Sequence, residues 1–287
     1  MTPVLLGLDI GGTSSRARLR SGDRIDEVDG PGANIATLEF ALVEQRLSAL
    51  LRGLGEARPD ACCAGAAGAE VPAARERLRA LLERRLPGTR VDVVHDTRLV
   101  LAAAGLAAGI AVIAGTGSVA YALSPDGRES RRGGWGWMLG DEGGGAWVVR
   151  EAARVVMARH DDGCPLGPLG DALLAACGVD SPQAMVAHLH AMGEARQWAA
   201  LAASVFATAG ADPASRDIIR RAADSLAALA LPLRDLVDGP VVLAGGLLLH
   251  HPDLEEAVRE RLPMRCVRLE NPPVEGGVRL AEALLTR

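Results

Sequence analysis

The aspartate at position 9 stands where an acid can take part in phosphate chemistry. Asp9 ends the apolar run VLLGLD and directly precedes the turn Ile10-Gly11-Gly12-Thr13. A carboxylate there can hold Mg²⁺, directly or through water, while the amides of residues 11 to 13 face phosphate oxygens. An aspartate that caps a β-turn produces the same pattern, so both interpretations stay open.

A second acid follows another apolar run. Asp96 comes directly after VDVVH and precedes a helical segment that begins near Thr97. α/β folds place reactive groups at the carboxyl ends of strands, and in phosphoryl transfer a carboxylate can accept the proton of an alcohol. Aspartate is also favoured as a helix N-cap, and one residue can have both roles.

A second glycine turn repeats the first without an acid. Gly115-Thr116-Gly117-Ser118 lies between the apolar runs AVIA and VAYAL. Its backbone N–H and hydroxyl groups can hold phosphate or substrate, although an ordinary hairpin turn has the same composition. Two such turns predict two domains that meet along a cleft around one nucleotide.

Two further glycine-rich segments are candidates for ligand binding. In GGWGWMLGDEGGGAW, residues 133–147, the tryptophans can pack against a sugar face or anchor the loop, and the acids precede a helix that starts near Gly144. Those acids can equally offset the helix dipole. In VVLAGG, residues 241–246, the glycines allow a flat ring such as adenine to approach the backbone. His250 and His251 have no third ligand in view and are expected to be exposed loop residues.

The sequence predicts that strands and helices of a mixed α/β fold position these residues. We expect strands at 4–9, 14–20 and 24–29, in DACCAGAAG (60–68) and VDVVHD (91–96), on both sides of the glycine turn within 110–123, and in GPVVLAGG (239–246). We expect helices at about 38–51 and 72–86, from near Thr97, at about 145–160, 167–177, 182–191, 194–208 and 213–237, from Pro252, and at 277–285. The expected domains are 1–108, with the C-terminal helix 277–287 packing back on it, and 109–276 with a helical insertion.

Composition excludes several classes of protein. The chain has 287 residues, 49% of them hydrophobic, a net charge of -5 and only 2% aromatic residues, which argues against nucleic acid as a partner. It contains no lysine, so P-loop, protein-kinase and Schiff-base chemistries are excluded. Five cysteines without CxxC spacing are expected to be small buried residues. With no leader pattern and no long apolar stretch, we expect a soluble cytoplasmic protein and no membrane contact.

These motifs, in this order, resemble the sugar-kinase, Hsp70 and actin superfamily. Within it the chain looks most like the BadF/BadG/BcrA/BcrD ATPase family and its N-acetylglucosamine kinase branch. The string GGWGWMLGDEGGGAW is the most specific part of the resemblance, followed by GLDIGGTSSR and IAGTGS. The resemblance implies two ribonuclease H-like domains around a central ATP cleft, ATP and Mg²⁺ as cofactors, and a homodimer.

The resemblance also implies roles for individual residues. Asp9 would serve the Mg²⁺ site, and Asp96 would deprotonate the sugar hydroxyl. The residues that would contact the sugar are Asn34, Ser118, Gly134, Trp135, Gly136 and Asp141. Those that would bind the nucleotide are Gly11, Gly12, Thr13, Thr116, Gly117 and Gly245.

The predicted activity is an ATP-dependent amino-sugar kinase that phosphorylates the 6-hydroxyl of N-acetylglucosamine or glucosamine. Ile35, Ala36 and Val119 depart from the residues of the animal enzymes where the amino substituent would be read, so both sugars stay open. One alternative is an ATPase that activates a dehydratase, which needs cysteine thiolates for an iron–sulfur cluster. Another is a non-catalytic sugar sensor, which would typically lack one of the two acids.

Overall fold

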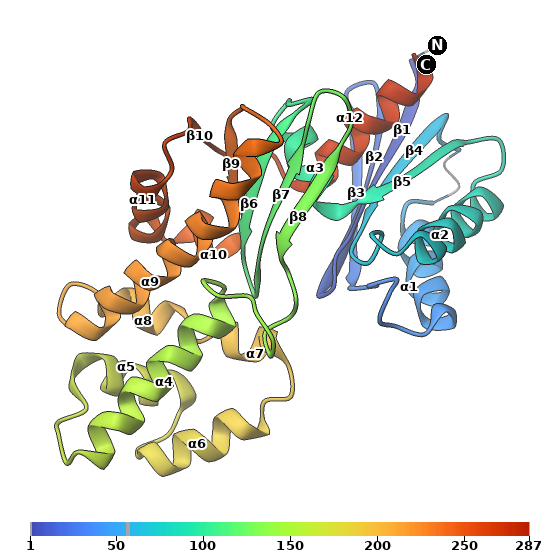
Figure 1. Cartoon of the computed structure of the whole chain (residues 1–287). Helices are drawn as coiled ribbons and strands as arrows, with labels where there is room; N and C mark the ends of the chain where they lie inside the picture. The colour runs from blue at the N-terminus through green and yellow to red at the C-terminus, as the bar shows by residue number, and fades with distance from the viewer. Residues whose placement is uncertain (1, 56–57, 287) are drawn as a thin grey trace. The chain divides into compact units, whose positions relative to one another are not determined.

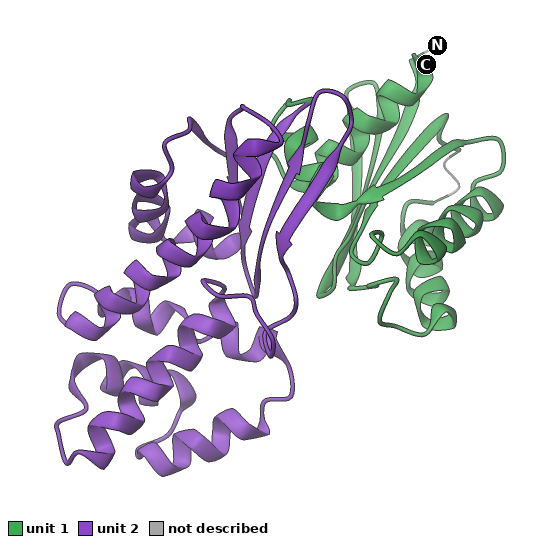
Figure 2. Ribbon diagram, viewed as in Figure 1, with its two compact units in different colours: residues 1–107, 269–287 green, residues 108–268 purple. Residues whose placement is uncertain are grey.

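The chain divides into two compact units (Figures 1 and 2). The computed structural model describes residues 2–55 and 58–286. Unit 1 comprises residues 1–107 and 269–287, and unit 2 comprises residues 108–268. The expected domain ranges include residues 1, 56, 57 and 287, which lie outside the described part of the chain.

Unit 1 is built on a five-stranded mixed sheet in the order β3-β2-β1-β4-β5. Its strands are β1 (Val4–Ile10), β2 (Ser14–Ser21), β3 (Arg24–Pro31), β4 (Ala61–Ala66) and β5 (Arg90–His95). The first three form an antiparallel meander, whereas β4 is parallel to both β1 and β5. The carboxyl ends of β1, β4 and β5 therefore meet at one edge of the sheet.

Helices cover both faces of this sheet. Residues of α1 (Phe40–Gly53) and α2 (Pro72–Arg85) share a core with Leu6 and Leu8 of β1. Residues of α3 (Asp96–Ala103) and α12 (Pro273–Leu285) pack on the other face, around Leu5 and Cys63. All six residues of β4 are buried, as expected of a central strand covered on both sides.

The last helix, α12, packs closely against the other elements of unit 1 (Figure 1). It packs on α3, β1 and β4, and it begins at Pro273 instead of the expected Gly277 because proline is well suited to a first helical turn. A Cβ on Gly276 would overlap the carbonyl oxygen of Leu99 and would lie 2.8 Å from the amide of Ala103. Glycine at this position therefore allows the two helices to touch by their backbones.

Unit 2 is built on a second five-stranded sheet, in the order β10-β9-β6-β7-β8. Its strands are β6 (Gly109–Ala114), β7 (Ser118–Leu123), β8 (Glu129–Gly133), β9 (Val241–Ala244) and β10 (Cys266–Arg268). Its longer helices are α4 (Gly145–Asp161), α5 (Gly167–Cys177), α6 (Pro182–Ala191), α9 (Pro213–Ala230) and α11 (Pro252–Arg261). Shorter ones are α7 (Ala195–Ala199), α8 (Ala203–Ala207), α10 (Gly246–His250) and the 3₁₀ turn Leu231–Asp235.

Unit 2 departs from the sequence expectations at several points. The expected helix 194–208 splits into α7 and α8, because the amides of Leu201, Ala202 and Ser204 bond three residues back and tighten the chain. Two short strands, β8 and β10, and the short helix α10 were not expected, since each is too short to show a period.

Three side chains also differ from expectation. Cys164 is exposed, because it lies in the loop after α4 instead of the core. His250 ends α10, and the ring of His251 stacks on Phe206 with centroids 3.7 Å apart, so neither is simply a loop residue.

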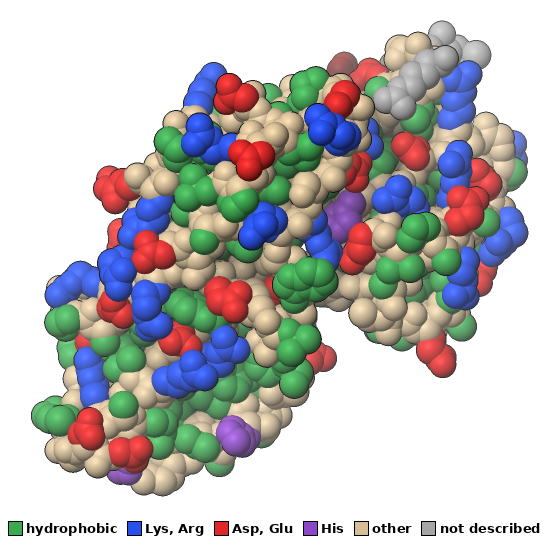
Figure 3. All heavy atoms as spheres, in the orientation of Figure 1, with side chains coloured by type: hydrophobic (Ala, Val, Ile, Leu, Met, Phe, Trp, Pro, Cys, Tyr) green, Lys and Arg blue, Asp and Glu red, His purple; other side chains and the backbone are tan. Residues whose placement is uncertain are grey.

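Charged groups are dispersed over the protein surface. Figure 3 shows acidic and basic side chains interspersed on the visible face of each unit. Many are paired, as in Arg16 with Asp29 at 2.6 Å and Arg220 with Asp217 at 2.6 Å. Within the described residues, none of the helices combines the length and apolar character that crossing a membrane requires.

The backbone contact at Gly276 yields a stability prediction. Gly276→Ala should lower the free energy of unfolding by about 1–3 kcal/mol, because overpacking outweighs the helix propensity that alanine gains. Gly193→Ala is the control, since a Cβ there would meet no atom within 4 Å. Equal urea denaturation curves for the two variants would contradict the close packing of α12.

Candidate functional site

Asp9 and Asp96, the two acids predicted to be functional, lie at one edge of the unit 1 sheet, where the charge of Asp96 acts on Asp9. In the strand register Ile10 lies opposite Ala66, and Ala66 lies opposite His95, so Asp9 and Asp96 flank the same row of the sheet. Burial, together with the negative charge of Asp96, raises the pKa of Asp9 to about 7, although Arg16 acts in the opposite direction. The charged form of Asp9 is therefore only partly compensated by Arg16.

The first glycine turn offers free donors beside Asp9. The Gly11 amide donates to the carbonyl of Ser14 at 3.0 Å. Among residues 2–55 and 58–286, no acceptor is found for the amides of Gly12 and Thr13, and both residues are exposed. The turn packs closely on Gly32, where a Cβ would overlap Gly12. The free amides can receive an anion such as a phosphate oxygen.

Asn34 is fixed at the same edge by its own loop. The Ala33 amide donates to the carbonyl of Gly11 at 3.0 Å, and the Ile35 amide donates to the carbonyl of Ala67 at 3.0 Å. The Oδ1 atom of Asn34 accepts from the amides of Ala36 at 2.9 Å and Thr37 at 3.2 Å. This Asx turn engages the side-chain oxygen, so the amide nitrogen is the group that Asn34 can offer to a ligand.

In unit 2 the second glycine turn is attached to the start of α4. The amide of Gly145 donates to the carbonyl of Gly115 at 2.8 Å, and that of Ala146 donates to Thr116 at 3.1 Å. A Cβ on Gly144 would lie 2.6 Å from the Cα of Gly117, so these backbones also touch. The first amides of α4 thus bind the turn's carbonyl oxygens instead of remaining open for an anion.

Asp141 lies against the same turn in a strained conformation. Of the described residues other than glycine, only Asp141 has a positive φ, at 61°. Its Oδ1 accepts from the amide of Gly136 at 3.3 Å, and a Cβ on Gly117 would overlap its Oδ2. Burial raises the pKa of Asp141, and backbone hydrogen bonds from Gly136 and Ser118 oppose that rise. Strain of this kind is typical of functional positions.

The glycine–tryptophan loop holds its two tryptophans differently. Trp137 anchors the loop, since its ring lies 5.7 Å from that of Trp198 and its carbonyl accepts from Arg150 at 3.0 Å. Trp135 is 69% exposed, with the guanidinium of Arg131 5.2 Å from its ring centroid. Trp135 is therefore the exposed tryptophan ring of this loop.

The remaining predicted residues of unit 2 lie beside the second turn. The amide of Gly134 donates to the carbonyl of Ser118 at 2.9 Å, and the Ser118 hydroxyl is buried and donates to the carbonyl of Glu142 at 2.7 Å. Gly245 has φ of 92°, and a Cβ there would overlap Ala114 at the end of β6. The site residues of unit 2 are thus brought together around one turn.

Sequence reasoning missed two groups beside Asp96. His95 is buried, with its Nδ1 atom 3.0 Å from Oδ1 of Asp96 and its Nε2 atom 3.4 Å from Oε2 of Glu70. The dipeptide His95-Asp96 at a strand end was a visible signal. No signal in the sequence pointed to Glu70, because only the fold brings the loop after β4 next to the end of β5.

Mg²⁺ fits the acids of unit 1 on chemical grounds. No cluster of three or more His, Cys, Asp or Glu side chains suited to a metal occurs in the described part of the chain. Mg²⁺ does not need one, because it is usually held by one or two carboxylates together with substrate phosphates and water. The raised pKa of Asp9 shows that a nearby cation would stabilise its ionised form.

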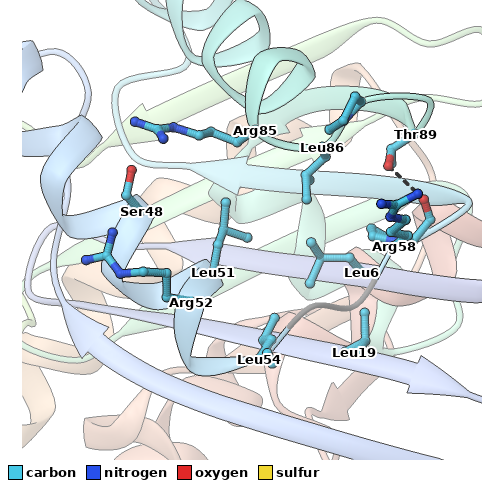
Figure 4. A pocket seen from close by; sticks show the side chains of 13 residues that line it. Leu6, Leu19, Ser48, Leu51, Arg52, Leu54, Arg58, Arg85, Leu86 and Thr89 are labelled. Carbon is cyan, nitrogen blue, oxygen red and sulfur yellow. Dashed lines mark hydrogen bonds between the residues drawn. The ribbon is translucent and has the colours of Figure 1, made fainter.

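A cavity of about 510 Å³ in unit 1 lies away from these residues (Figure 4). Its walls include Leu6, Leu19 and Thr89, near the amino ends of the parallel strands. The Thr89 hydroxyl donates to the carbonyl of Pro59 at 2.7 Å. None of the predicted site residues lines this cavity.

Comparisons with known proteins agree with the fold. The profile of the BadF/BadG/BcrA/BcrD ATPase family matches residues 6–271. A candidate N-acetylglucosamine kinase from Chromobacterium violaceum is 30% identical, with a TM-score of 0.78 over 98% of this chain and 99% of that one. This likeness confirms the predicted two-domain α/β fold of the sugar-kinase type.

Two curated relatives are similar over part of their length. The N-acetylmuramic acid/N-acetylglucosamine kinase of Clostridium acetobutylicum is 30% identical over 168 residues, 55% of this chain and 54% of that protein. The N-acetyl-D-glucosamine kinase of Dictyostelium discoideum is 25% identical over 193 residues, 60% of this chain and 59% of that protein. The chain thus spans just over half the length of each.

The raised pKa of Asp9 makes stability depend on pH. The folded protein binds this proton more tightly than the unfolded chain, where the pKa is 3.8, so stability falls as pH rises from there to about 7. Asp9→Asn should therefore raise the free energy of unfolding at pH 8 by roughly 1–4 kcal/mol, a gain that vanishes near pH 4.

Urea denaturation without Mg²⁺ or nucleotide measures this effect. Asp23→Asn, which removes an exposed carboxylate from a turn of the same unit, is the matched control. A constant difference between Asp9→Asn and the unsubstituted protein across this pH range would contradict the electrostatic account of Asp9.

Proposed function

Because this chain belongs to the BadF/BadG/BcrA/BcrD ATPase family, we propose that it is an ATP-dependent amino-sugar kinase. It transfers the γ-phosphoryl group of ATP to the 6-hydroxyl of N-acetylglucosamine or glucosamine. The observation that carries the proposal is the pair Asp9 and Asp96 at one sheet edge, beside a turn with free amides. The names of the curated relatives support the sugar class.

Asp96 is the catalytic base in this proposal. Its Oδ1 atom accepts from the Thr97 amide at 2.8 Å, and its side chain is 28% exposed. Within the described residues no hydrogen bond to Oδ2 is found, so this oxygen is the one that receives the proton of the sugar hydroxyl. Phosphoryl transfer needs little covalent help from the protein, so orienting this hydroxyl is the main task of Asp96.

Asp9 is the residue that would hold Mg²⁺. The bound ion supplies charge neutralisation on the phosphates. The amides of Gly12 and Thr13 bind phosphate oxygens, a role that matters more here because the chain has no lysine.

Unit 2 carries the other residues to which the sequence assigns ligand contacts. Thr116 and Gly117 bind the nucleotide through their amides, for which no acceptor is found in the described part of the chain. Gly245 packs by its backbone on Ala114 at the end of β6, and its contact with the nucleotide is proposed from the family resemblance. Asp141 accepts hydrogen bonds from sugar hydroxyls, and Trp135 packs against the sugar face, an arrangement common in carbohydrate sites.

Two observations favour a kinase over the alternatives. A sensor that has lost turnover would not need both Asp9 and Asp96, which are present. A dehydratase activator needs several accessible thiolates, but Cys62 and Cys63 are fully buried in β4, where burial raises the pKa of Cys63 to about 12, and Cys164 is exposed in a loop of the other unit. Cytoplasmic location, a homodimer and the lack of a nucleic-acid partner stay predictions from the sequence.

A coupled assay of ADP release identifies the acceptor. The sugars to compare are N-acetylglucosamine, glucosamine, N-acetylmuramic acid, N-acetylmannosamine and glucose. We expect amino sugars to stimulate ADP release well above the rate with glucose, because Asn34 and Asp141 offer polar contacts to the sugar. If none of the five stimulates turnover, the kinase proposal is wrong.

Substitution of Asp96 should lower the rate of phosphoryl transfer without weakening nucleotide binding. Asp96→Asn should lower kcat by about 10²–10⁴-fold while nucleotide affinity, measured by calorimetry, changes little. Asp92→Asn is the matched control, since Asp92 lies on β5 and accepts a hydrogen bond from the neighbouring Val93 amide at 2.9 Å. Near-normal turnover by Asp96→Asn would rule out its role as base.

A further inference from the structure

The cavity of unit 1 has an apolar interior and exposed basic side chains, and the proposed kinase function does not use it (Figure 4). Its volume of about 510 Å³ is within the range of small-molecule sites and well above the voids that close-packed domains usually contain. Its lining includes the buried side chains of Leu6 and Leu19, which are paired on β1 and β2, and of Leu86, which follows α2. This interior favours a ligand with an apolar body.

The charged side chains that line the cavity, among the described residues, are all arginines. Arg52 and Arg58 are exposed, and neither guanidinium has a hydrogen bond or an ion pair with any residue that the structure describes. Arg85 differs, because it donates to Oε1 of Glu44 at 3.0 Å and neutralises that carboxylate. Two unpaired positive charges therefore lie beside an apolar cavity.

The ends of helices explain only part of this arrangement. Arg52 lies in the last turn of α1, where a positive charge offsets the helix dipole. Arg58 belongs to no helix or strand, so this explanation does not apply to it.

Ser48 adds an independent observation. It lies one helical turn before Arg52 and also lines the cavity, on the same side of it as Arg52 in Figure 4. Its Oγ atom is buried, and no hydrogen-bond partner for it is found in the described part of the chain. Buried polar groups without a partner are rare in native proteins, and an oxygen atom of a ligand would supply one here.

We propose that this cavity binds an organic anion, a compound with an apolar body and a carboxylate, sulfonate or phosphate group. The body lies against the leucines. The anionic group lies beside Arg52 and Ser48, which donate hydrogen bonds to it, and Arg58 adds positive charge from the other side. A guanidinium suits this task because its N–H groups match two oxygens of such a group.

This site does not depend on the proposed kinase function. Pro59 and Thr89 of its lining precede β4 and β5, whereas Asp9 and Asp96 lie at the carboxyl ends of β1 and β5. The cavity and the two acids are therefore at opposite ends of the same parallel strands. The anion binds here whether or not the chain phosphorylates a sugar.

Two fluorescent probes with one ring system separate the apolar body from the charge. 8-Anilinonaphthalene-1-sulfonate has an apolar body and one anionic group, and N-phenyl-1-naphthylamine is the same body without the anionic group. We expect the sulfonate to bind one site per chain with a Kd of roughly 1–100 μM, and more tightly than the neutral probe. Inorganic phosphate, an anion without the apolar body, should not displace it.

Three substitutions locate the bound probe. Arg52→Gln should weaken binding of the sulfonate roughly 10-fold, because a hydrogen bond to a charged group is lost, and should leave the affinity for the neutral probe within about 2-fold. Arg24→Gln is the matched control, since it removes an exposed arginine of β3 that does not line the cavity, and it should change neither affinity. Leu54→Trp fills the cavity and should weaken both probes about 10-fold. If Leu54→Trp does not fold, the two arginine variants decide, because both change exposed side chains.

Each titration is repeated with excess ATP and Mg²⁺, because an aromatic anion can also enter a nucleotide site. We expect no displacement of the sulfonate. Equal affinity of Arg52→Gln and the unsubstituted protein for the sulfonate, or its displacement by ATP, overturns the inference and leaves the kinase function intact. Absence of sugar-dependent turnover overturns the proposed function and leaves this site intact.

Discussion

The parallel pairing of β1, β4 and β5 is the constraint on which the unit 1 site depends. Parallel strands end at the same edge, so three segments that are distant in sequence deliver Asp9, the loop after β4 and Asp96 to one place. The pairing is possible because small residues fill the centre of the sheet. At Gly65, for example, a Cβ would overlap the side chain of Leu99 in α3. A larger residue there would displace the helix that begins with Asp96.

Unit 2 arranges its site around a different interaction. There the backbone of the second glycine turn binds the first amides of α4, and glycines 117 and 144 bring the two segments into direct contact. The amides at the N-terminus of α4 donate to carbonyl oxygens of the turn. The partial positive charge of the helix N-terminus therefore stabilises the turn instead of a ligand. Asp141 is then held against the turn with φ of 61°, a left-handed conformation that aspartate tolerates better than most residues other than glycine.

Much of the fold and part of the site were accessible from the sequence because they are encoded locally. Asp9 with its glycine turn, and Asp96 after a run of apolar residues, are patterns of a few consecutive residues. Glu70 was inaccessible because its partner His95 is brought to it only by strand pairing. The burial of the Ser118 hydroxyl likewise follows from a tertiary hydrogen bond. The Asx turn that leaves the side-chain nitrogen of Asn34 available is, by contrast, a local contact. The break between α7 and α8 could not be predicted either, because the stretch is rich in alanine, which favours a continuous helix.

The return of the chain to unit 1 has a consequence for biosynthesis. Unit 1 is assembled from the first 107 residues and the last segment, and Val278 and Ala281 of α12 cover Leu5 and Cys63 of its sheet. During translation this apolar face stays open while all of unit 2 is made. Unit 2, which is continuous in sequence, can complete its core first, whereas the sheet of unit 1 lacks the cover of α12 until residues 273–285 have been made. The region that carries Asp9 and Asp96 therefore becomes stable after unit 2.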